Sequence, residues 1–254
     1  MSRRLFEPGD PNPAVVLNAG ADSPFLIICD HAGRSVPGVL GDLGLPAAEF
    51  DRHIAWDIGA AGVAGKLAEA LQAPCILQRY SRLVIDCNRD PSAADSIAEV
   101  SDGTTVPGNL GLSPEDRRAR LELIHTPYHE AIARELDARA ARGIATAMVA
   151  IHSFTPVMNS FERPWLMGVL HLGDSRFSDA VLAELRREER LNCGDNEPYM
   201  MDGTDYTIPL HAIGRGLPYV ELEIRQDLIG GEAGQAEYAA LLARVLPAAL
   251  GSAG

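Results

Sequence analysis

Cysteine is scarce in this sequence and long apolar runs are missing, and both absences exclude classes of protein. Four cysteines are spread along 254 residues without a CxxC pair, which argues against a thiolate zinc site or a disulfide framework. The first residues, MSRRLFEPGDPNP, lack the apolar core of a secretory signal, and no run reaches the roughly 20 apolar residues of a membrane-spanning helix. We therefore expect a cytoplasmic protein with buried, reduced thiols and no membrane partner.

Basic residues are also few. The chain has 22 Lys and Arg against 35 Asp and Glu, a formal net charge of −13, and its basic residues form no run that would follow a phosphate backbone. Nucleic acid is therefore not an expected partner. An anionic substrate would have to be held by local arginines against the general field of the protein, so arginines beside catalytic groups are candidate binding residues.

Short apolar runs rich in β-branched residues alternate with longer segments of helical period. This alternation is typical of an α/β protein in which helices cover both faces of a mostly parallel sheet. A chain of this length commonly folds as a single domain, here residues 1–254. The predicted strands are residues 25–29, 74–77, 83–87, 147–151, 166–170 and 219–224. The predicted helices are residues 46–71, 113–142, 175–190 and 232–246.

One helix start and two long loops can be predicted from local chemistry. Ser113 is followed by Pro114 and two acidic residues, so it combines a capping serine, a proline at the first helical position and early negative charge. Residues 88–112 and 192–213 have no period and are predicted to be loops. Long loops often carry function.

Two histidines follow predicted strands at their carboxyl ends. His31 comes after the strand at residues 25–29, and His152 comes after the strand at residues 147–151, each before a turn. Binding sites of open α/β sheets gather at this edge, so two histidines presented in the same way indicate a shared site. The alternative for His31 is a solvated turn histidine.

Two glutamates lie near the end of the last predicted strand. The spacing of Glu221 and Glu223 places both carboxylates on one face. A buried carboxylate is costly unless it reaches a cation or hydrogen-bond donors. We expect one of the two to be catalytic, and the alternative is a structural ion pair with Arg225.

A carboxylate beside the two histidines would complete a set of metal ligands. His53 and Asp57 are four residues apart in the first predicted helix and therefore share a face. Two histidines and one carboxylate leave zinc an open position for water, as hydrolysis requires. His125 and His129 have similar spacing, but Pro127 lies between them and a helix surface is the alternative.

Arginines stand on both sides of the predicted strand at residues 83–87. Arg82 precedes it, and Arg89 lies at its carboxyl edge beside Asn88. A guanidinium next to an amide donor is well shaped to hold a substrate carboxylate through paired hydrogen bonds. The alternative is a surface arginine at the start of an acidic loop.

Eight segments follow one another between about Cys29 and Ile229: CDHAGRSVP, HIAWDIGA, YSRLVIDCNR, TPYH, IHSFTPV, RPWLMGVL, GDNEPY and LEIRQDLI. In this order they resemble the N-formylglutamate amidohydrolase family, particularly its broad, poorly assigned branch. That family is similar in fold to zinc carboxypeptidases and aspartoacylases. The resemblance implies a three-layer αβα sandwich of phosphorylase/hydrolase type with a mixed, mostly parallel sheet.

The resemblance also implies roles for individual residues. By this resemblance His31 and His152 are expected to be metal ligands, and Glu223 is expected to be the general base. Asn88 and Arg89 are expected to hold the carboxylate of the substrate.

The third metal ligand is less directly implied. Zinc carboxypeptidases have a glutamate three residues after their first ligand histidine, whereas this chain has Arg34. Asp57 in AWDIGA is the expected third ligand, because an aspartate of the family recurs near there. Asp30 and Asp86 are the alternatives, as substitute ligands or as partners that orient a histidine.

The implied activity is hydrolysis of the amide bond of an N-formyl or other N-acyl amino acid, such as N-formylglutamate. Zinc or another divalent metal would activate water, Glu223 would move the proton, and Arg82 would stabilise the oxyanion. The expected partner is this small-molecule substrate, and a homo-oligomer is compatible with the sequence. The alternatives are a carboxypeptidase-like zinc hydrolase of a small peptide and a non-catalytic small-molecule binding protein of the same fold.

Overall fold

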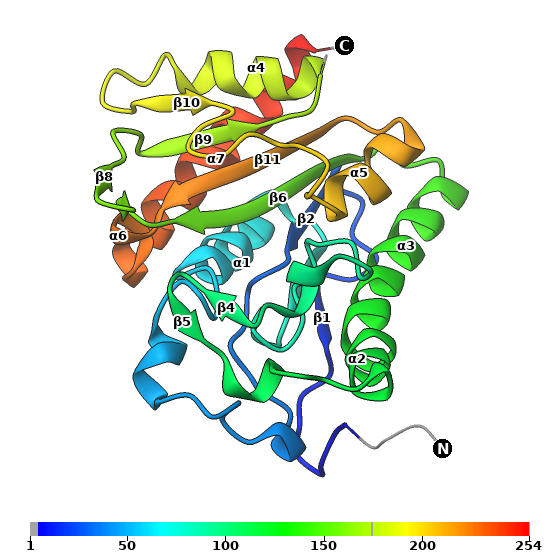
Figure 1. Cartoon of the computed structure of the whole chain (residues 1–254). Helices are drawn as coiled ribbons and strands as arrows, with labels where there is room; N and C mark the ends of the chain where they lie inside the picture. Colours follow the sequence, from blue (N-terminus) through cyan, green and yellow to red (C-terminus); the bar gives the residue numbers. More distant parts are fainter. Residues whose placement is uncertain (1–4, 174, 254) are drawn as a thin grey trace.

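The computed structural model describes residues 5–173 and 175–253. The strands of its central sheet are β1 Ala14–Leu17, β2 Phe25–Cys29, β3 Cys75–Gln78, β6 Ala147–Phe154, β9 Met167–Leu170, β10 Cys193–Asp195 and β11 Tyr219–Arg225. Within the described residues these seven strands lie in the order β1-β3-β2-β6-β11-β9-β10 (Figure 1).

The sheet is mixed and mostly parallel. Strands β3, β2, β6 and β11 run parallel to their neighbours in this row. At one edge β1 is antiparallel to β3, and on the other side β9 is antiparallel to β11 while β10 is parallel to β9. Every residue of β2 and β6 is buried, as expected for strands covered on both faces.

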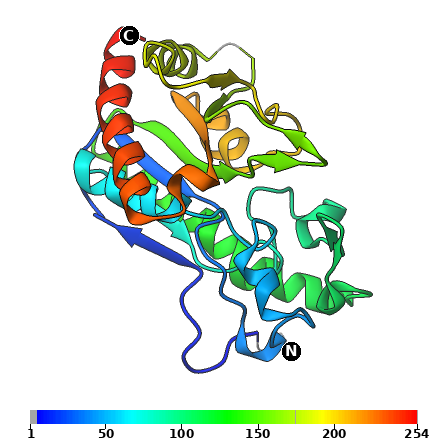
Figure 2. The same ribbon diagram turned by 90° about the vertical axis from the view of Figure 1, so that its left-hand side faces the viewer.

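Helices pack on both faces of the sheet. One face carries α1 Ala60–Leu71, α4 Arg176–Leu185, α6 Gln226–Ile229 and α7 Glu232–Ser252. The other carries α3 Thr126–Ala141 and α5 Thr207–His211, and α2 Pro114–Arg120 precedes α3. In β2, Phe25 and Ile27 point into the core under α1 and α7, whereas Leu26 and Ile28 point into the core under α3. Figure 2 shows α7 on one side of the molecule and the segment around residues 100–105 on the other. The predicted three-layer α/β fold is confirmed.

The predicted helix at residues 113–142 is confirmed as a continuous helical run. The Ser113 hydroxyl accepts a hydrogen bond from the Asp116 N–H at 3.1 Å, and Pro114 occupies the first turn. A π turn, Leu121–His125, separates α2 from α3. Pro127 gives a physical reason for it, because a proline inside a helix lacks its N–H and crowds the carbonyl four residues earlier.

The predicted strand at residues 83–87 is wrong, because this segment is a buried turn. The Val84 N–H donates to the Ser81 carbonyl at 2.9 Å, and the Leu83 N–H donates to the Ser81 hydroxyl at 3.2 Å. The apolar side chains enter the core under α3 without joining the sheet. A short apolar run reports burial and does not by itself distinguish a strand from a turn.

Other predicted boundaries differ from the structure. The first predicted helix, residues 46–71, is a 3-10 segment, Ala47–Asp51, followed by turns, and α1 begins only at Ala60. The helix predicted at residues 175–190 ends earlier, at Leu185, and the last helix continues beyond Pro247 to Ser252. Two edge strands were not predicted, β1 with four residues and β10 with three.

Both segments predicted to be loops contribute residues to the cavity, but the prediction for residues 192–213 is partly wrong, because this segment includes β10 and α5. Residues 88–112 contain only 3-10 turns and a small hairpin, β4 Val100–Ser101 with β5 Thr104–Thr105. A second hairpin, β7 Val157–Met158 with β8 Phe161–Glu162, follows β6.

All four cysteines lie in the described part of the chain and are buried and unpaired, as the sequence analysis expected. In residues 5–173 and 175–253, none of the helices combines the length and apolar character needed to cross a bilayer.

Candidate active site

The turn after β2 carries Asp30 and His31, and a glycine holds it in place. A Cβ on Gly33 would lie 2.0 Å from the Arg79 carbonyl oxygen, so no other residue fits without moving the backbone. The Ser35 N–H donates to that same carbonyl at 3.2 Å. The CDHAGRS segment is thereby held at the carboxyl edge of the sheet, with both Asp30 and His31 buried.

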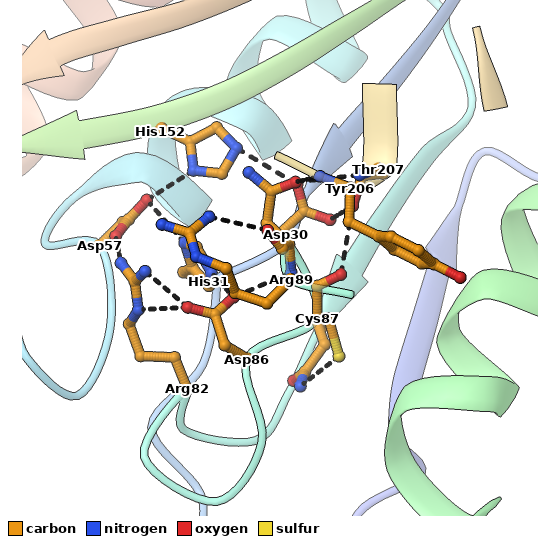
Figure 3. Close-up of polar contacts among 12 residues, drawn as sticks. Asp30, His31, Asp57, Arg82, Asp86, Cys87, Arg89, His152, Tyr206 and Thr207 are labelled. Carbon is orange, nitrogen blue, oxygen red and sulfur yellow. Dashed lines mark hydrogen bonds and ion pairs between the residues drawn. The ribbon is translucent and has the colours of Figure 1, made fainter. Parts of the chain in front are cut away.

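Asp57 approaches His31 from a second loop. Two residues after it, Gly59 has a φ of +82° and precedes α1, and a Cβ there would lie 2.1 Å from the Ile229 carbonyl oxygen. Glycine is the residue that accepts both this left-handed backbone and this close contact. The chain turns sharply into α1, and the Asp57 carboxylate points toward His152 (Figure 3).

His53 does not share a helix face with Asp57, contrary to the prediction, because both residues precede α1. His53 Nε2 lies 3.5 Å from the Asp102 carboxylate. Both His53 and Asp57 line the same cavity, but only Asp57 contacts the other histidines.

His152 lies within β6 and not after it, because the strand continues to Phe154. It is in register with Glu223 on the neighbouring strand β11. Residues in register on adjacent strands project from the same face of a sheet, and residues two apart share that face. The side chains of His152, Glu223 and Glu221 therefore project toward the side that the loop at residues 88–112 covers.

Three ligand-type side chains converge here, and we call His31, Asp57 and His152 the ligand triad. Asp57 Oδ2 lies 3.3 Å from His31 Nδ1 and 2.9 Å from His152 Nδ1, and the two imidazole centroids are 5.1 Å apart. Ligand atoms around a tetrahedral zinc ion, with bonds of about 2 Å, lie roughly 3.3 Å from one another. Among the described residues no other group of three His, Cys, Asp or Glu converges in this way. The donor set and its spacing fit a divalent metal ion.

A further carboxylate faces the outer nitrogen of each imidazole. His31 Nε2 lies 2.7 Å from Asp86 Oδ1, and His152 Nε2 lies 3.2 Å from Asp30 Oδ2. The Thr207 hydroxyl donates to Asp30 Oδ1 at 2.7 Å. A carboxylate on the outer nitrogen orients an imidazole and leaves Nδ1 directed at the shared position. This geometry makes Asp30 and Asp86 partners of the histidines, one of the two alternatives that the sequence left open.

The charges of this cluster shift the pKa values of its members. Burial lowers the pKa of His152, but hydrogen bonds with Asp30 and Asp57 outweigh burial and raise that pKa well above its ordinary value. Burial raises the pKa of Asp57, and the charge of His31 together with the hydrogen bond to His152 reverses this and holds the pKa below its usual range. The site therefore keeps an ionised carboxylate where a cation would bind.

Glu221 and Glu223 are both buried in β11, with 2% and 7% of their surface exposed. Among the described residues, Oε2 of each has no hydrogen-bond partner. Burial raises the pKa of each carboxyl to about 8, although His152 opposes the shift. Arg225, the partner in the alternative interpretation, instead donates from Nε to Asp227 at 2.8 Å, so the structural glutamate–arginine pair is not formed.

Arg82 lies beside the ligand triad. Its Nε and Nη2 donate to Asp86 Oδ2 at 3.0 and 2.6 Å, and its Nη1 lies 3.6 Å from Asp57 Oδ1. Figure 3 shows the guanidinium between these two carboxylates. Because Arg82 also lines the cavity, it brings positive charge next to the position that the triad defines.

Asn88 and Arg89, the pair predicted to hold a substrate carboxylate, line the cavity, but much of their hydrogen-bonding capacity is used within the protein. Asn88 Oδ1 accepts from the backbone N–H groups of Tyr206 and Thr207 at 3.0 and 2.9 Å. Arg89 Nε donates to Asp95 Oδ2 at 3.2 Å. A substrate carboxylate at this position would therefore share the guanidinium with Asp95.

The histidine pair of the predicted helix belongs to a separate cluster. The rings of His125 and His129 lie 4.3 Å apart, His129 Nδ1 lies 3.0 Å from His211 Nε2, and His129 Nε2 donates to the Cys87 carbonyl at 2.9 Å. Burial lowers the pKa of His129 to about 3 and that of His211 to about 4. These are neutral, hydrogen-bonded imidazoles, and neither a ligand set nor an exposed helix surface is formed.

The cavity has a volume of about 510 Å³ and includes residues that the sequence analysis did not single out. Asp205 and Tyr199 come from the segment at residues 192–213, for which irregular composition was the one available signal. Behind Tyr199, Arg163 Nη1 donates to the phenol oxygen at 2.9 Å and its guanidinium lies 4.6 Å from the ring centroid.

Comparison with known proteins identifies a family and related solved structures. The family model of N-formylglutamate amidohydrolases matches residues 23–230. The solved structure of a gene product from Agrobacterium tumefaciens is 39% identical, with a TM-score of 0.95 over 98% of this chain and 99% of that one. An N-formylglutamate amidohydrolase from Ralstonia eutropha shares the fold, with 18% identity and a TM-score of 0.64 over 94% of this chain and 98% of that one. The search of curated proteins finds no match. Because the family model matches most of this chain, the chain belongs to the N-formylglutamate amidohydrolase family and is an amidohydrolase by that membership.

Proposed function

We propose that this amidohydrolase is metal-dependent and cleaves the amide bond of an N-acyl amino acid. One observation carries the proposal. The ligand triad converges on a single position, and Glu223, a buried carboxylate whose Oε2 has no partner among the described residues, is in register with one of its histidines. Metal-assisted hydrolysis of an amide requires this combination of ligands and a base.

The ligand triad would hold the ion, and we propose zinc because two imidazoles and one carboxylate form a set that zinc prefers. When bound, the ion supplies Lewis acidity that activates water and polarises an amide carbonyl. The surrounding carboxylates of Asp30 and Asp86 would keep both imidazoles oriented through their outer nitrogens.

Glu223 would act first as a base and then as an acid. Its carboxylate takes a proton from the attacking water, whose oxygen bonds to the acyl carbon. The carboxyl returns this proton to the amide nitrogen as the C–N bond breaks. The products are a carboxylic acid, which is formate for an N-formyl substrate, and a free amino acid.

The arginines would bind the negative charges of the reaction. Arg82 lies beside Asp57 and would stabilise the charge that develops on the carbonyl oxygen. Arg89 and the amide N–H₂ of Asn88 would hold the α-carboxylate of the substrate. This contact would orient the amide toward Glu223.

The test is hydrolysis of N-formyl amino acids, beginning with N-formylglutamate, followed as release of the free amino acid. We expect turnover that is lost on chelation and regained with zinc, and we expect His152→Ala not to regain it. The same assay with N-acetyl amino acids and with small peptides separates the proposed activity from that of a peptidase. Absence of turnover on every N-acyl substrate by the zinc-loaded protein would contradict the proposal.

A further inference from the structure

The charges that line the cavity are unevenly matched. Its wall carries eight carboxylates, two guanidiniums and three imidazoles. Both guanidiniums already have carboxylate partners, because Arg82 donates to Asp86 at 2.6 Å and Arg89 donates to Asp95 at 3.2 Å. A substrate with a second carboxylate, such as a glutamate derivative, would find no unpaired arginine for it among the described residues of the wall.

Glu221 is the opposite case, a buried carboxylate in the wall without an ion-pair partner in contact with it among the described residues. It is 2% exposed, and its Oε2 has no hydrogen-bond partner among the residues that the structure describes. In register with it are Ala150 on β6 and Leu170 on β9, both apolar. The proposed reaction does not use Glu221, since the base is Glu223.

Asp205 places a second carboxylate within electrostatic range of Glu221. After burial, and against the opposing charge of His152, the charges of Asp205 and Glu223 help to raise the pKa of Glu221 to about 8. Asp205 Oδ1 is only loosely compensated, because Arg89 Nη1 lies 3.8 Å away and the Asn88 amide donates to it at 3.4 Å. A bound cation would supply the partner that Glu221 Oε2 lacks and a closer opposite charge for Asp205.

The occupant that fits is an organic cation on an apolar stem. A second metal ion is not indicated, because outside the ligand triad the described residues contain no converging set of three ligands. An ammonium or guanidinium group needs no such set, since it binds one or two carboxylates by charge-assisted hydrogen bonds. Leu170, which also lines the cavity, offers apolar surface to a methylene stem, and a volume of about 510 Å³ leaves room for a long side chain.

We propose that Glu221, with Asp205 near it, selects substrates whose amino-acid side chain ends in a positive charge. The amino acid released is then basic, of the lysine or arginine type. This inference rests on the proposed function, since it names the side chain of the N-acyl amino acid cleaved at the same site. Arg89 holds the α-carboxylate, Glu223 faces the amide, and Glu221 receives the cation.

The experiment compares N-formyl-L-lysine, N-formyl-L-norleucine and N-formyl-L-glutamate on the zinc-loaded protein. Norleucine is the neutral match for the lysine stem. The wild type should cleave the lysine derivative with a kcat/KM at least about tenfold above both others, the effect of one partly desolvated charged hydrogen bond. Glu221→Gln should remove about tenfold or more from the lysine derivative, mainly through KM, and change the norleucine derivative by less than about threefold.

The controls separate this inference from the proposed function. Glu237→Gln makes the same change on the exposed side of α7 and should alter none of the three rates. Calorimetric titration with free lysine, norleucine and glutamate measures the same contact without turnover. The wild type should bind lysine most tightly, and Glu221→Gln should lose that preference. Absence of all turnover contradicts the proposed function, whereas a wild type without preference for lysine in rate and binding overturns this inference. Equal losses for all three substrates in Glu221→Gln also overturn it, and the wild-type comparison remains decisive if that variant does not fold.

Discussion

Asp57 contacts His31 twice, through its backbone and through its side chain. The Asp57 N–H donates to the His31 carbonyl at 3.0 Å, and Asp57 Oδ2 lies 3.3 Å from His31 Nδ1. The backbone contact aligns the two loops, and the side-chain contact brings two ligand atoms together. Because protein hydrogen bonds hold this arrangement, we expect the geometry of the triad to persist when metal is removed.

The first prediction concerns the glycine that turns the chain from Asp57 into α1. Gly59→Ala should lower the free energy of unfolding by about 2 kcal/mol or more, because it adds a Cβ to a left-handed residue and places it against the Ile229 carbonyl. Urea unfolding measures the change. We also expect weaker zinc binding, since relief of the clash displaces Asp57.

Gly65→Ala, inside the helix α1 that follows Gly59, is the matched control. A Cβ at Gly65 meets no atom within 4 Å, so this substitution should stabilise the protein by roughly 0.5–1 kcal/mol through helix propensity. Equal effects at the two glycines would show that the turn after Asp57 is not constrained as described.

The second prediction concerns the base. Glu223→Gln should keep the metal and lose most turnover, because an amide cannot take a proton from the attacking water. Metal content and rate are to be measured on the same sample. Turnover near that of the wild type would remove Glu223 from the reaction and direct attention to Glu221.

The third prediction concerns the carboxylate contact. Arg89→Ala should weaken binding of an N-acyl amino acid by roughly tenfold and leave its α-amide analogue nearly unchanged, because the guanidinium discriminates by charge. We expect no larger effect, since Asp95 already shares this arginine and its side chain is 23% exposed. Inhibition constants for the paired analogues measure the difference. Equal losses for the acid and the amide would leave Arg89 a structural residue.

The fourth prediction concerns stability and pH in the metal-free protein. Burial raises the pKa of Glu221 from 4.5 to about 8, so between these values the folded state keeps a proton that the unfolded chain has released. The contribution of this group to stability is therefore present at low pH and lost as the pH rises through that window. Glu221→Gln should remove this loss and be more stable than the wild type at pH 8.5 by about 1 kcal/mol or more, but not at pH 5.

Urea unfolding at the two pH values, with a chelator present, measures the effect. Other groups with raised pKa values, His31 and His152 among them, remain in both proteins, so only the difference between the curves is assigned to Glu221. Wild-type and variant stabilities that change in parallel with pH would contradict the prediction.

Several features of the fold and site follow from local sequence. The continuous apolar runs of β2 and β6 predict strands, because a strand covered on both faces needs apolar side chains on both of its sides. His31 and His152 come at or near the ends of those strands. The cap at Ser113 is equally local, since its partner is three residues away.

Long-range contacts explain what the sequence analysis missed. Residues 83–87 are as apolar as a strand, but the N–H groups of Val84 and Asp86 donate to the carbonyls of Ser81 and Ser96 and not to a neighbouring strand. Asp57 was expected on a helix with His53, and it reaches His31 because Gly59 packs against Ile229, a residue far along the chain. The spacing of residues in one segment carries no information about such partners.

The central claim is that the ligand triad holds one catalytic metal ion, and elemental analysis of purified protein tests it most directly. After incubation with zinc and removal of free metal, the wild type should contain about one zinc ion per chain and His152→Ala close to none, because two remaining ligands do not hold zinc tightly. His129→Ala, which alters the separate histidine cluster, should bind as much zinc as the wild type. Zinc absent from the wild type, or retained equally in His152→Ala, would contradict the account.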